Sequence, residues 1–529
     1  MVILQNVRYV HPDKDVLFDN LHLIVEQHNK IALIGNNGAG KSTLLQIIAG
    51  VLQPTTGLLK ITSTPYYIPQ LFGQFNGFSI AQALNVDSKL KALNSILAGN
   101  VTEENLVLLN DDWTIEERCR EALAYWKLDG FDVNQKMETL SGGQKTKVFL
   151  AGILIHQPKL VLLDEPSNHL DTSARRLLYD FIKSTSASLI VVSHDRKLLN
   201  LLDAVYELGK RGITKYGGNY DFYREQKLIE GSALNQEVKS KEKALRKAKE
   251  VERETAERKQ RLDVRGKKKQ EKAGVPTIAL NTLRNNAEKS TSRLKDVHAE
   301  KVDAISQDLN ELRQALPDVD KMKPDFDQSQ LHKGKVLFAA KELNHAYDNS
   351  PLWRKRIELE ITSGERVALK GSNGSGKTTM IKIILGQIEP TSGEVYRAAS
   401  KSVYIDQDYS LINNQLTVYE QAQKFNFSAL QEHEIKIRLN RFLFTKEFWD
   451  KRCNSLSGGE KMRLILCCLT IGNQAPDMIV LDEPTNNLDI QNIEILTAAI
   501  NQFKGTLLVV SHDEDFLEQV NIERTIYLK

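Results

Sequence analysis

The chain has 529 residues, of which 41% are hydrophobic and 26% are charged, and this composition excludes a disordered protein. Its length predicts about three to four domains. No stretch of about eighteen apolar residues occurs, which excludes a typical membrane-spanning helix, and residues 1–6 lack the basic region and apolar core of a signal peptide. The four cysteines have no metal-ligand spacing, so we expect unbridged thiols and a cytoplasmic location.

The first elements along the chain predict an α/β core. Residues 30–34 form an apolar strand directly before a glycine-rich loop, and a helix is expected over residues 42–49. Further buried strands are expected at 159–163 and 188–192, and polar residues follow both of them. Because open α/β sheets bind ligands at the carboxyl ends of their strands, these polar residues are candidates for one site.

The glycine-rich loop is typical of a phosphate-binding site, and it occurs twice. Its glycines let backbone amides turn toward phosphates at a helix N-terminus, the lysine adds a positive charge, and the following hydroxyl can bind magnesium. The second copy follows an apolar strand at 366–369, and this repetition makes a chance match negligible. The loops comprise Gly35, Asn36, Asn37, Gly38, Ala39, Gly40, Lys41, Ser42 and Thr43, and Gly371, Ser372, Asn373, Gly374, Ser375, Gly376, Lys377, Thr378 and Thr379.

An acidic pair follows a buried strand in both halves. Asp164 and Asp482 are placed to hold the magnesium shell together with Ser42 or Thr378. The next residues, Glu165 and Glu483, are placed to orient or deprotonate an attacking water. Such a pair can also simply cap the following helix, but its matched distance after Ser-Gly-Gly in both halves favours the catalytic interpretation.

Four more polar residues recur at matched positions. Gln70 and Gln407 are expected to contact the metal and the terminal phosphate, and His194 and His512, each before an aspartate, are expected to contact that phosphate. A lone histidine after a strand is usually structural. Its recurrence in both halves favours a functional role.

The two halves form an internal repeat with one difference in length. Lys41 and Lys377 are about 336 positions apart, whereas Ser141 and Ser457 are about 316 positions apart. The first half therefore contains about twenty extra residues, which we expect near 85–113, where leucines have helical spacing. A functional surface insertion and ordinary length variation of a helical subdomain both fit.

Residues 223–316 predict a helical linker, because they are dominated by Lys, Arg, Glu and Gln and contain a long helical run at 237–265. Apolar residues spaced by three and four over 302–316 form a seam, so we expect two antiparallel helices with a turn at about 266–282. Residues 231–300 contain 19 Lys and Arg against 11 Asp and Glu, whereas the whole chain has a net charge of +3.

The basic excess is concentrated toward the expected turn, at 258–261 and 265–269, where a phosphate backbone could bind. A solvated coiled-coil face is the simpler alternative for a charge run. The asymmetry of the charge and the apolar residues of the turn favour nucleic-acid binding. Those apolar residues are Val275, Pro276, Ile278, Leu280 and Leu283.

These motifs resemble the ATP-binding cassette superfamily over roughly residues 1–225 and 335–529. The resemblance implies that ATP and Mg²⁺ are bound, that both sites hydrolyse ATP, and that each Ser-Gly-Gly signature closes over the nucleotide of the opposite cassette. The signatures are Ser141, Gly142 and Gly143, and Ser457, Gly458 and Gly459. By the resemblance, one site combines Lys41, Gln70, Glu165 and His194 with Ser457 and Gly459, and the other combines Lys377, Gln407, Glu483 and His512 with Ser141 and Gly143.

The resemblance also assigns residues at the edge of each site. Tyr347 fits the aromatic residue that stacks on adenine in the second half, and either Tyr9 or His11 fits this position in the first half. Asp171 and Asp489 match the loop by which one cassette contacts the other.

Two cassettes without membrane spans, joined by such a linker, resemble the ABC-F family of translation factors, which includes ribosome-protection proteins; residues 167–171 and 219–223 also match its pattern. The resemblance implies an α/β fold of two P-loop cassettes, 1–225 and 331–529, joined by an antiparallel coiled-coil linker, 226–330. It further implies a monomer with intramolecular cassette pairing, and ribosomal RNA and tRNA as partners. A general translation factor and an antibiotic-resistance protein both fit.

Two other classes of ATPase share part of this pattern. An ATPase subunit of a transporter would need a membrane partner, and its cassettes are rarely joined by a long basic hairpin. A DNA-repair ATPase of the cassette type would carry zinc-binding cysteine pairs or much longer coiled coils, which this sequence lacks.

Overall fold

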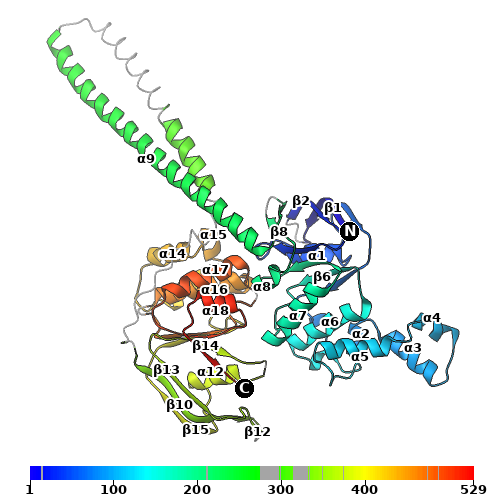
Figure 1. Cartoon of the computed structure of the whole chain (residues 1–529). Helices are drawn as coiled ribbons and strands as arrows, with labels where there is room; N and C mark the ends of the chain where they lie inside the picture. The colour runs from blue at the N-terminus through cyan, green and yellow to red at the C-terminus, as the bar shows by residue number, and fades with distance from the viewer. Residues whose placement is uncertain are drawn as a thin grey trace. The chain divides into compact units, whose positions relative to one another are not determined.

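The computed structural model describes residues 1–12, 16–209, 212–273, 297, 299–313, 332, 334–347, 350–372, 374–472, 475–486 and 488–528. The chain divides into two compact units, one formed by Met1–Tyr223 with Met322–Lys529 and the other by Arg224–Lys321. The first unit contains both α/β repeats, which we call the first repeat (residues 1–223) and the second repeat (residues 334–528) (Figure 1). Among the helices of the described ranges, none has the length and hydrophobicity needed to cross a membrane.

A six-stranded sheet forms the centre of the first repeat, with the strand order β5-β6-β7-β3-β8-β9. Neighbouring strands are parallel except β9, which is antiparallel to β8. Every residue of β6 and β7 is buried, as expected for central strands covered on both faces. The strands are β3 (Lys30–Ile34), β5 (Pro65–Ile68), β6 (Leu160–Asp164), β7 (Ser188–Val192), β8 (Ala204–Gly209) and β9 (Gly212–Tyr216). The predicted α/β core is confirmed.

A second, antiparallel sheet of the first repeat has the order β2-β1-β4. Its strands are β1 (Val2–Val10), β2 (Val16–Val25) and β4 (Thr56–Ile61). Leu4 and Leu23 of this sheet share one buried cluster with Leu45 of helix α1 (Lys41–Ile48) and Leu162 of β6. This packing holds the start of α1 near the ends of the central strands.

Helices α3 and α4 lie within the insertion that the repeat comparison predicts near 85–113, and they pack against each other. At the corresponding place in the second repeat, residues 425–431 form a short loop between two helices. The remaining helices of the first repeat are α2 (Ile80–Ala83), α3 (Asp87–Leu97), α4 (Glu103–Leu109), α5 (Ile115–Tyr125), α6 (Gly142–His156), α7 (Thr172–Ser184) and α8 (Arg196–Leu199), with 3-10 turns η1 (Gly73–Phe75) and η2 (Met137–Thr139).

The second repeat has the same architecture around a parallel five-stranded sheet with the order β16-β17-β18-β14-β19. Smaller antiparallel sheets have the orders β13-β10-β15 and β11-β12. The strands are β10 (Val336–Asn344), β11 (Ala346–Tyr347), β12 (Ser350–Pro351), β13 (Ile357–Thr362), β14 (Arg366–Lys370), β15 (Ser392–Arg397), β16 (Ser402–Ile405), β17 (Met478–Asp482), β18 (Thr506–Val510) and β19 (Arg524–Tyr527).

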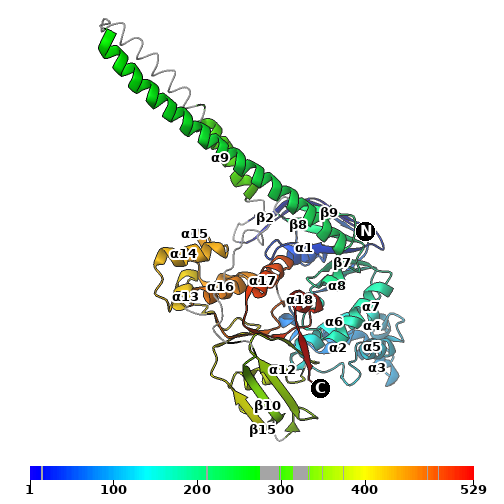
Figure 2. The ribbon, with the colours of Figure 1, turned by 60° about the vertical axis from the view of Figure 1, so that its left-hand side comes forward.

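The helices of the second repeat follow the same order along the chain (Figure 2). They are α12 (Lys377–Ile384), α13 (Val418–Lys424), α14 (Glu432–Arg441), α15 (Lys446–Trp449), α16 (Gly458–Ile471), α17 (Ile490–Gln502) and α18 (Glu514–Gln519), with one 3-10 turn, η3 (Cys453–Ser455). All four cysteines of the chain are buried and unbridged, which confirms the predicted thiols.

The second unit contains most of α9 (Tyr220–Ala273), a 54-residue helix that is about 80 Å long at 1.5 Å per residue. Helical residues 299–313 run beside it in both views of the ribbon (Figures 1 and 2). Lys241 contacts Asp308 at 2.5 Å and Arg313 contacts Glu242 at 2.6 Å, so ion pairs join the two helices. The predicted pair of helices is therefore present.

The expected start of the turn, at residue 266, is wrong, because α9 continues to Ala273. A single interior glycine such as Gly266 costs a helix only about 1 kcal/mol, which the surrounding strong helix formers can offset. The apolar residues predicted for the turn, between 275 and 283, lie outside the described residues.

Candidate functional site

The glycine loops curl around the lysines that end them. Lys41 Nζ donates hydrogen bonds to the carbonyl oxygens of Gly35 at 2.7 Å and Asn36 at 3.1 Å. Lys377 Nζ makes the matching bonds to Gly371 at 2.9 Å and Ser372 at 3.0 Å. Burial lowers the pKa of both lysines. Each loop thus holds a desolvated cation, which is suited to an anionic ligand.

The same loops leave the first amides of a helix without side-chain partners. Gly40 and Gly376 precede α1 and α12 in the left-handed conformation, with φ values of 96° and 85°, and neither helix has a capping side chain. Free amides at a helix N-terminus attract phosphate. Both repeats therefore have the loop geometry that phosphate binding requires. Asn373, which was predicted to belong to the second loop, lies outside the described residues.

The aspartates at the ends of β6 and β17 have buried carboxylates that suit a divalent cation. Asp164 Oδ1 is buried without a hydrogen-bond partner among the described residues. Asp482 Oδ2 accepts hydrogen bonds from the hydroxyls of Tyr404 at 2.9 Å and Thr378 at 3.4 Å. Burial raises the pKa of both aspartates, and a bound metal ion would favour the charged form. Oxygen donors of this kind fit Mg²⁺.

Sequence reasoning missed the tyrosines that orient these aspartates. Tyr67 donates a hydrogen bond to Asp164 Oδ2 at 3.4 Å, as Tyr404 does to Asp482. Each tyrosine lies three residues before the predicted glutamine, Gln70 or Gln407. This matched spacing in the two halves could have identified both tyrosines from the sequence. Trp353, whose Nε1 donates to the carbonyl of Ser375 at 2.9 Å, was also missed.

The two glutamates are held in the same unusual backbone conformation. Glu165 and Glu483 have φ values of 52° and 49°, in the left-handed region that non-glycine residues rarely adopt. Their amides donate to the carbonyl oxygens of Val192 and Val510, both at 2.8 Å, so adjacent strands fix each glutamate. Strained residues of this kind occur often at active sites.

Burial changes the protonation of the glutamates and of the histidines beside them. It raises the pKa of Glu165 to about 8, with a further increase from Asp164, and the pKa of Glu483 to about 7. It lowers the pKa of His194 to about 3 and of His512 to about 4. The histidines are therefore neutral at pH 7. A carboxylate with a pKa near neutrality is suited to general base catalysis.

The histidines contact the glutamates directly. His194 Nε2 lies 3.1 Å from Glu165 Oε1, and His512 Nε2 lies 3.4 Å from Glu483 Oε1. The amide of His512 also donates to Glu483 Oε2 at 3.3 Å. The structure thus brings together the glutamate and histidine predicted for each repeat.

Each cavity combines residues of both repeats. A cavity of about 340 Å³ is lined by the first glycine loop, Gln70, Asp164, Glu165 and His194 from the first repeat and by Ser457 from the second. A cavity of about 520 Å³ is lined by the second glycine loop, Gln407, Asp482, Glu483 and His512 from the second repeat and by Ser141, Gly142 and Gly143 from the first. Gly458 and Gly459 follow Ser457 in the first turn of α16.

The edges of the two cavities show which of the side chains predicted to stack on adenine lie at a site. Tyr347 lines the larger cavity, and its hydroxyl lies 3.1 Å from Thr379 Oγ1. His11 lines the smaller cavity, whereas Tyr9 packs against the hydrophobic cluster of the first repeat. The geometry therefore favours His11 over Tyr9 for this position.

The aspartates after the glutamates lie where the repeats meet. Asp489 Oδ2 accepts a hydrogen bond from the amide of Asn37, in the first glycine loop, at 2.8 Å. Its other oxygen accepts from the amide of Asn492 and caps α17. Asp171 caps α7 in the same way, by accepting from the amide of Ala174.

Comparison with known proteins finds a matching family model and many relatives. A family model described as "ABC transporter" matches residues 18–168 and 354–486. The chain is 31% identical to the "Putative ATP-binding protein YdiF" of Bacillus subtilis, over 96% of this chain and 77% of that protein. It is 28% identical to the "ATP-binding protein Uup" of Escherichia coli, over 97% and 78%, and 28% identical to the "ABC transporter F family member 5" of Arabidopsis thaliana, over 98% and 74%.

Among solved structures, the fold is similar to that of an archaeal ribosome recycling factor, aABCE1, in complex with the ribosomal stalk protein aP1. The TM-score is 0.60 at 20% identity, over 99% of this chain and 87% of that one. A structure described as "RNase-L Inhibitor" matches with a TM-score of 0.59 at 20% identity, over the same shares of both chains.

Proposed function

We propose, from the fact that this chain belongs to the ABC-F family of the ATP-binding cassette superfamily, that it is an ATP-gated translation factor that binds the ribosome. Its two cassettes bind and hydrolyse ATP. We place the first cassette at residues 1–225, the helical linker at 226–330 and the second cassette at 331–529.

The observation that carries the proposal is the composition of the two cavities, in which each glycine loop faces a signature serine of the other cassette. ATP in both sites would hold the cassettes together, and hydrolysis would let them separate. The nucleotide then acts by shifting the population between a closed and an open state. The closed state is the one that binds the ribosome.

Within each site, we assign roles from the contacts. Lys41 and Lys377 bind phosphates together with the loop amides, and Glu165 and Glu483 orient and deprotonate the attacking water. The neutral histidines lie beside these carboxylates and contact the terminal phosphate. Mg²⁺, held by Ser42, Gln70 and Asp164 or by Thr378, Gln407 and Asp482, would neutralise charge on the phosphate oxygens. His11 and Tyr347 would stack on adenine.

The linker supplies the contact with ribosomal RNA or tRNA. Its basic excess over residues 231–300 matches a phosphate backbone. A ribosome-bound ABCE1 is among the proteins of similar fold, although its identity to this chain is only 19%. Protection of the ribosome from an antibiotic and general assistance to translation are both compatible with a linker directed at tRNA.

Ribosome co-sedimentation of the Glu165→Gln, Glu483→Gln double variant tests the proposal. Glutamine should preserve ATP binding and block hydrolysis, so we expect ATP-dependent pelleting with ribosomes that weakens at high salt. Adding Lys41→Ala and Lys377→Ala provides the matched control, which should stay in the supernatant. A double variant that binds ATP but does not pellet with ribosomes would refute the proposal, and binding to membrane fractions instead would favour a transporter accessory.

A further inference from the structure

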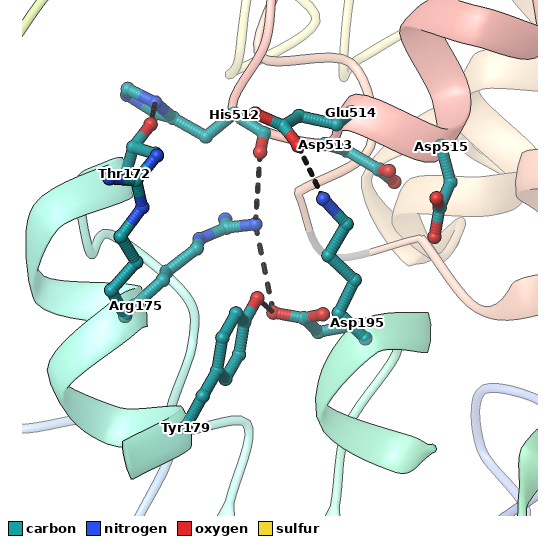
Figure 3. Close-up of a pocket in the computed structure, with 10 residues that line it drawn as sticks. Thr172, Arg175, Tyr179, Asp195, His512, Asp513, Glu514 and Asp515 are labelled. Atoms are coloured by element: carbon teal, nitrogen blue, oxygen red, sulfur yellow. Dashed lines mark hydrogen bonds and ion pairs between the residues drawn. The ribbon is translucent and has the colours of Figure 1, made fainter. Parts of the chain in front are cut away.

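Arg175, in α7 of the first cassette, lies between the histidine loops of the two sites (Figure 3). Its Nη1 lies 3.5 Å from the backbone carbonyl oxygen of His512, to which it donates, and 3.8 Å from Asp195 Oδ2. Its Nε donates to the carbonyl of Leu170 at 3.2 Å, which fixes the side chain near its own backbone. The same arginine lines the larger cavity beside Glu483.

The carboxylate that Arg175 contacts, Asp195, is itself held in place beside the first site. Asp195 directly follows His194, and its Oδ2 accepts a hydrogen bond from the hydroxyl of Tyr179 at 2.6 Å, as Figure 3 shows. Its Oδ1 accepts from the amide of Leu198 at 3.1 Å and caps α8. Arg175 therefore touches the residue after the first histidine and the backbone of the second histidine with one guanidinium group.

In α17 of the second cassette, the position that matches Arg175 holds a side chain that cannot make this contact. Asp171 and Asp489 cap α7 and α17 in the same way, so the residues four positions after them correspond. Those residues are Arg175 and Ile493, and Ile493 is 2% exposed and has no polar side-chain atom. Tyr179 corresponds to Thr497 by the same alignment. The side chain of Ile493 therefore cannot donate a reciprocal hydrogen bond to the backbone of His194.

We propose that Arg175 is a positioning residue that couples the second ATP site to the first cassette, so that the two sites are unequal. Anchored by Asp195 and by the carbonyl of Leu170, the arginine holds the loop of His512, and hence Glu483, in its working position. This contact links the first histidine loop to the loop of His512. The contact that α17 makes with the first histidine loop is of another kind, because Glu494 Oε1 lies 3.9 Å from Arg196 Nη2 and does not touch the backbone of His194. The inference rests on the assignment of Glu483 and His512 to the second site, but not on the ribosome as partner.

Single-site variants of the full chain test this asymmetry. In the Glu165→Gln background only the second site hydrolyses ATP, and in the Glu483→Gln background only the first site does. Into both we would introduce Arg175→Ile, which copies the residue of the second cassette, and Arg175→Lys, which keeps the charge. The measured quantities are kcat and KM for ATP without ribosomes.

We expect Arg175→Ile to lower kcat about tenfold in the Glu165→Gln background, within the usual range of coupling between sites, and to leave KM within about twofold. In the Glu483→Gln background we expect a change below about twofold. Lysine should restore part of the loss. Lys197→Met, which removes the Lys197–Glu514 ion pair between the same cassettes, is the matched control and should change neither rate by more than about twofold.

Equal losses in both backgrounds would overturn the proposal, because they would show a general loosening of the interface. An unchanged kcat of Arg175→Ile in the Glu165→Gln background would also overturn it. The thermal midpoint of Arg175→Ile separates a folding defect from a catalytic one. Hydrolysis that persists in the Glu165→Gln, Glu483→Gln double variant would instead refute the site assignment, and ribosome co-sedimentation tests the partner independently.

Discussion

The amide of Asn37 donates a hydrogen bond to Asp489 Oδ2 at 2.8 Å, which joins the first glycine loop to the loop before α17 of the other cassette. The second oxygen of the same carboxylate caps α17 through Asn492. One side chain thus serves a helix of the second cassette and the phosphate loop of the first. This double contact allows the two roles to be separated by mutation.

We expect Asp489→Asn to weaken ATP binding at the first site about tenfold while leaving the free energy of unfolding within about 0.5 kcal/mol, because asparagine is as good a cap as aspartate but has one acceptor oxygen and no charge. Asp489→Ala should additionally lose about 1 kcal/mol of stability. Titration with a fluorescent nucleotide and urea unfolding check the two effects. Unchanged ATP affinity in the asparagine variant would contradict the role of the Asn37 contact.

Gly40→Ala should remove ATP binding at the first site. Gly40 has a φ of 96°, and an added Cβ would lie 2.8 Å from Leu17 Cδ2 and 3.0 Å from Phe18 Cδ1, so the loop would have to shift. We expect the stoichiometry measured by calorimetry to fall from about two ATP per chain to about one.

Gly50→Ala is the control for this experiment. Gly50 also has a positive φ, of 76°, but an added Cβ would meet no atom within 4 Å. This variant should cost about 1 kcal/mol of stability from backbone strain and keep both ATP sites. A Gly40→Ala chain that still binds two ATP would show that the loop tolerates the shift.

Asp112 gives a pH-dependent contribution to stability at the insertion. Its Oδ2 lies 2.8 Å from both Lys89 Nζ of α3 and Arg118 Nη2 of α5. Burial alone would raise the pKa of Asp112, but the hydrogen bonds from Lys89 and Arg118 outweigh it and lower the pKa below its usual value. Because the folded-state pKa is lowered, this stabilisation is present above the unfolded pKa of about 4 and is lost as the pH falls through the folded value.

Asp112→Asn should therefore destabilise the chain by about 1 to 3 kcal/mol at pH 7, and the difference from the unmodified chain should shrink below about pH 4. Urea unfolding followed by circular dichroism between pH 3 and 7 would measure it. A difference that stays constant over this range would mean that the two cations do not act through the charge of Asp112.

Arg258 and Arg261 of α9 are exposed and belong to the basic part of the linker. If they contact phosphates of the ribosome, replacing both with glutamine should weaken ribosome binding and reduce the slope of log K against log salt by about one to two units. Glu254→Gln, which removes a nearby exposed negative charge, should not reduce the slope. The measurement is ribosome co-sedimentation over a salt series. It compares the hydrolysis-deficient chain with the same chain carrying either the two arginine replacements or Glu254→Gln.

The sequence determined the parts of this protein that depend on neighbouring residues. Apolar runs between polar segments predicted β3 and β7 with the bounds that the structure shows, and the strand-loop-helix order placed Lys41 and Lys377 at the starts of helices α1 and α12. Matched spacing of the repeat located the insertion that contains α3 and α4. Such local patterns follow from side-chain periodicity and backbone geometry, and a single sequence contains them in full.

The tertiary structure decided what depends on distances between remote residues. It brought Ser457 to the first cavity, placed His11 there while Tyr9 packs against a buried cluster, and put Arg175 within reach of His512. Arg175 and His512 are separated by 337 positions. Periodicity and motif spacing do not encode such a separation, because the contact arises only when two folded cassettes face each other.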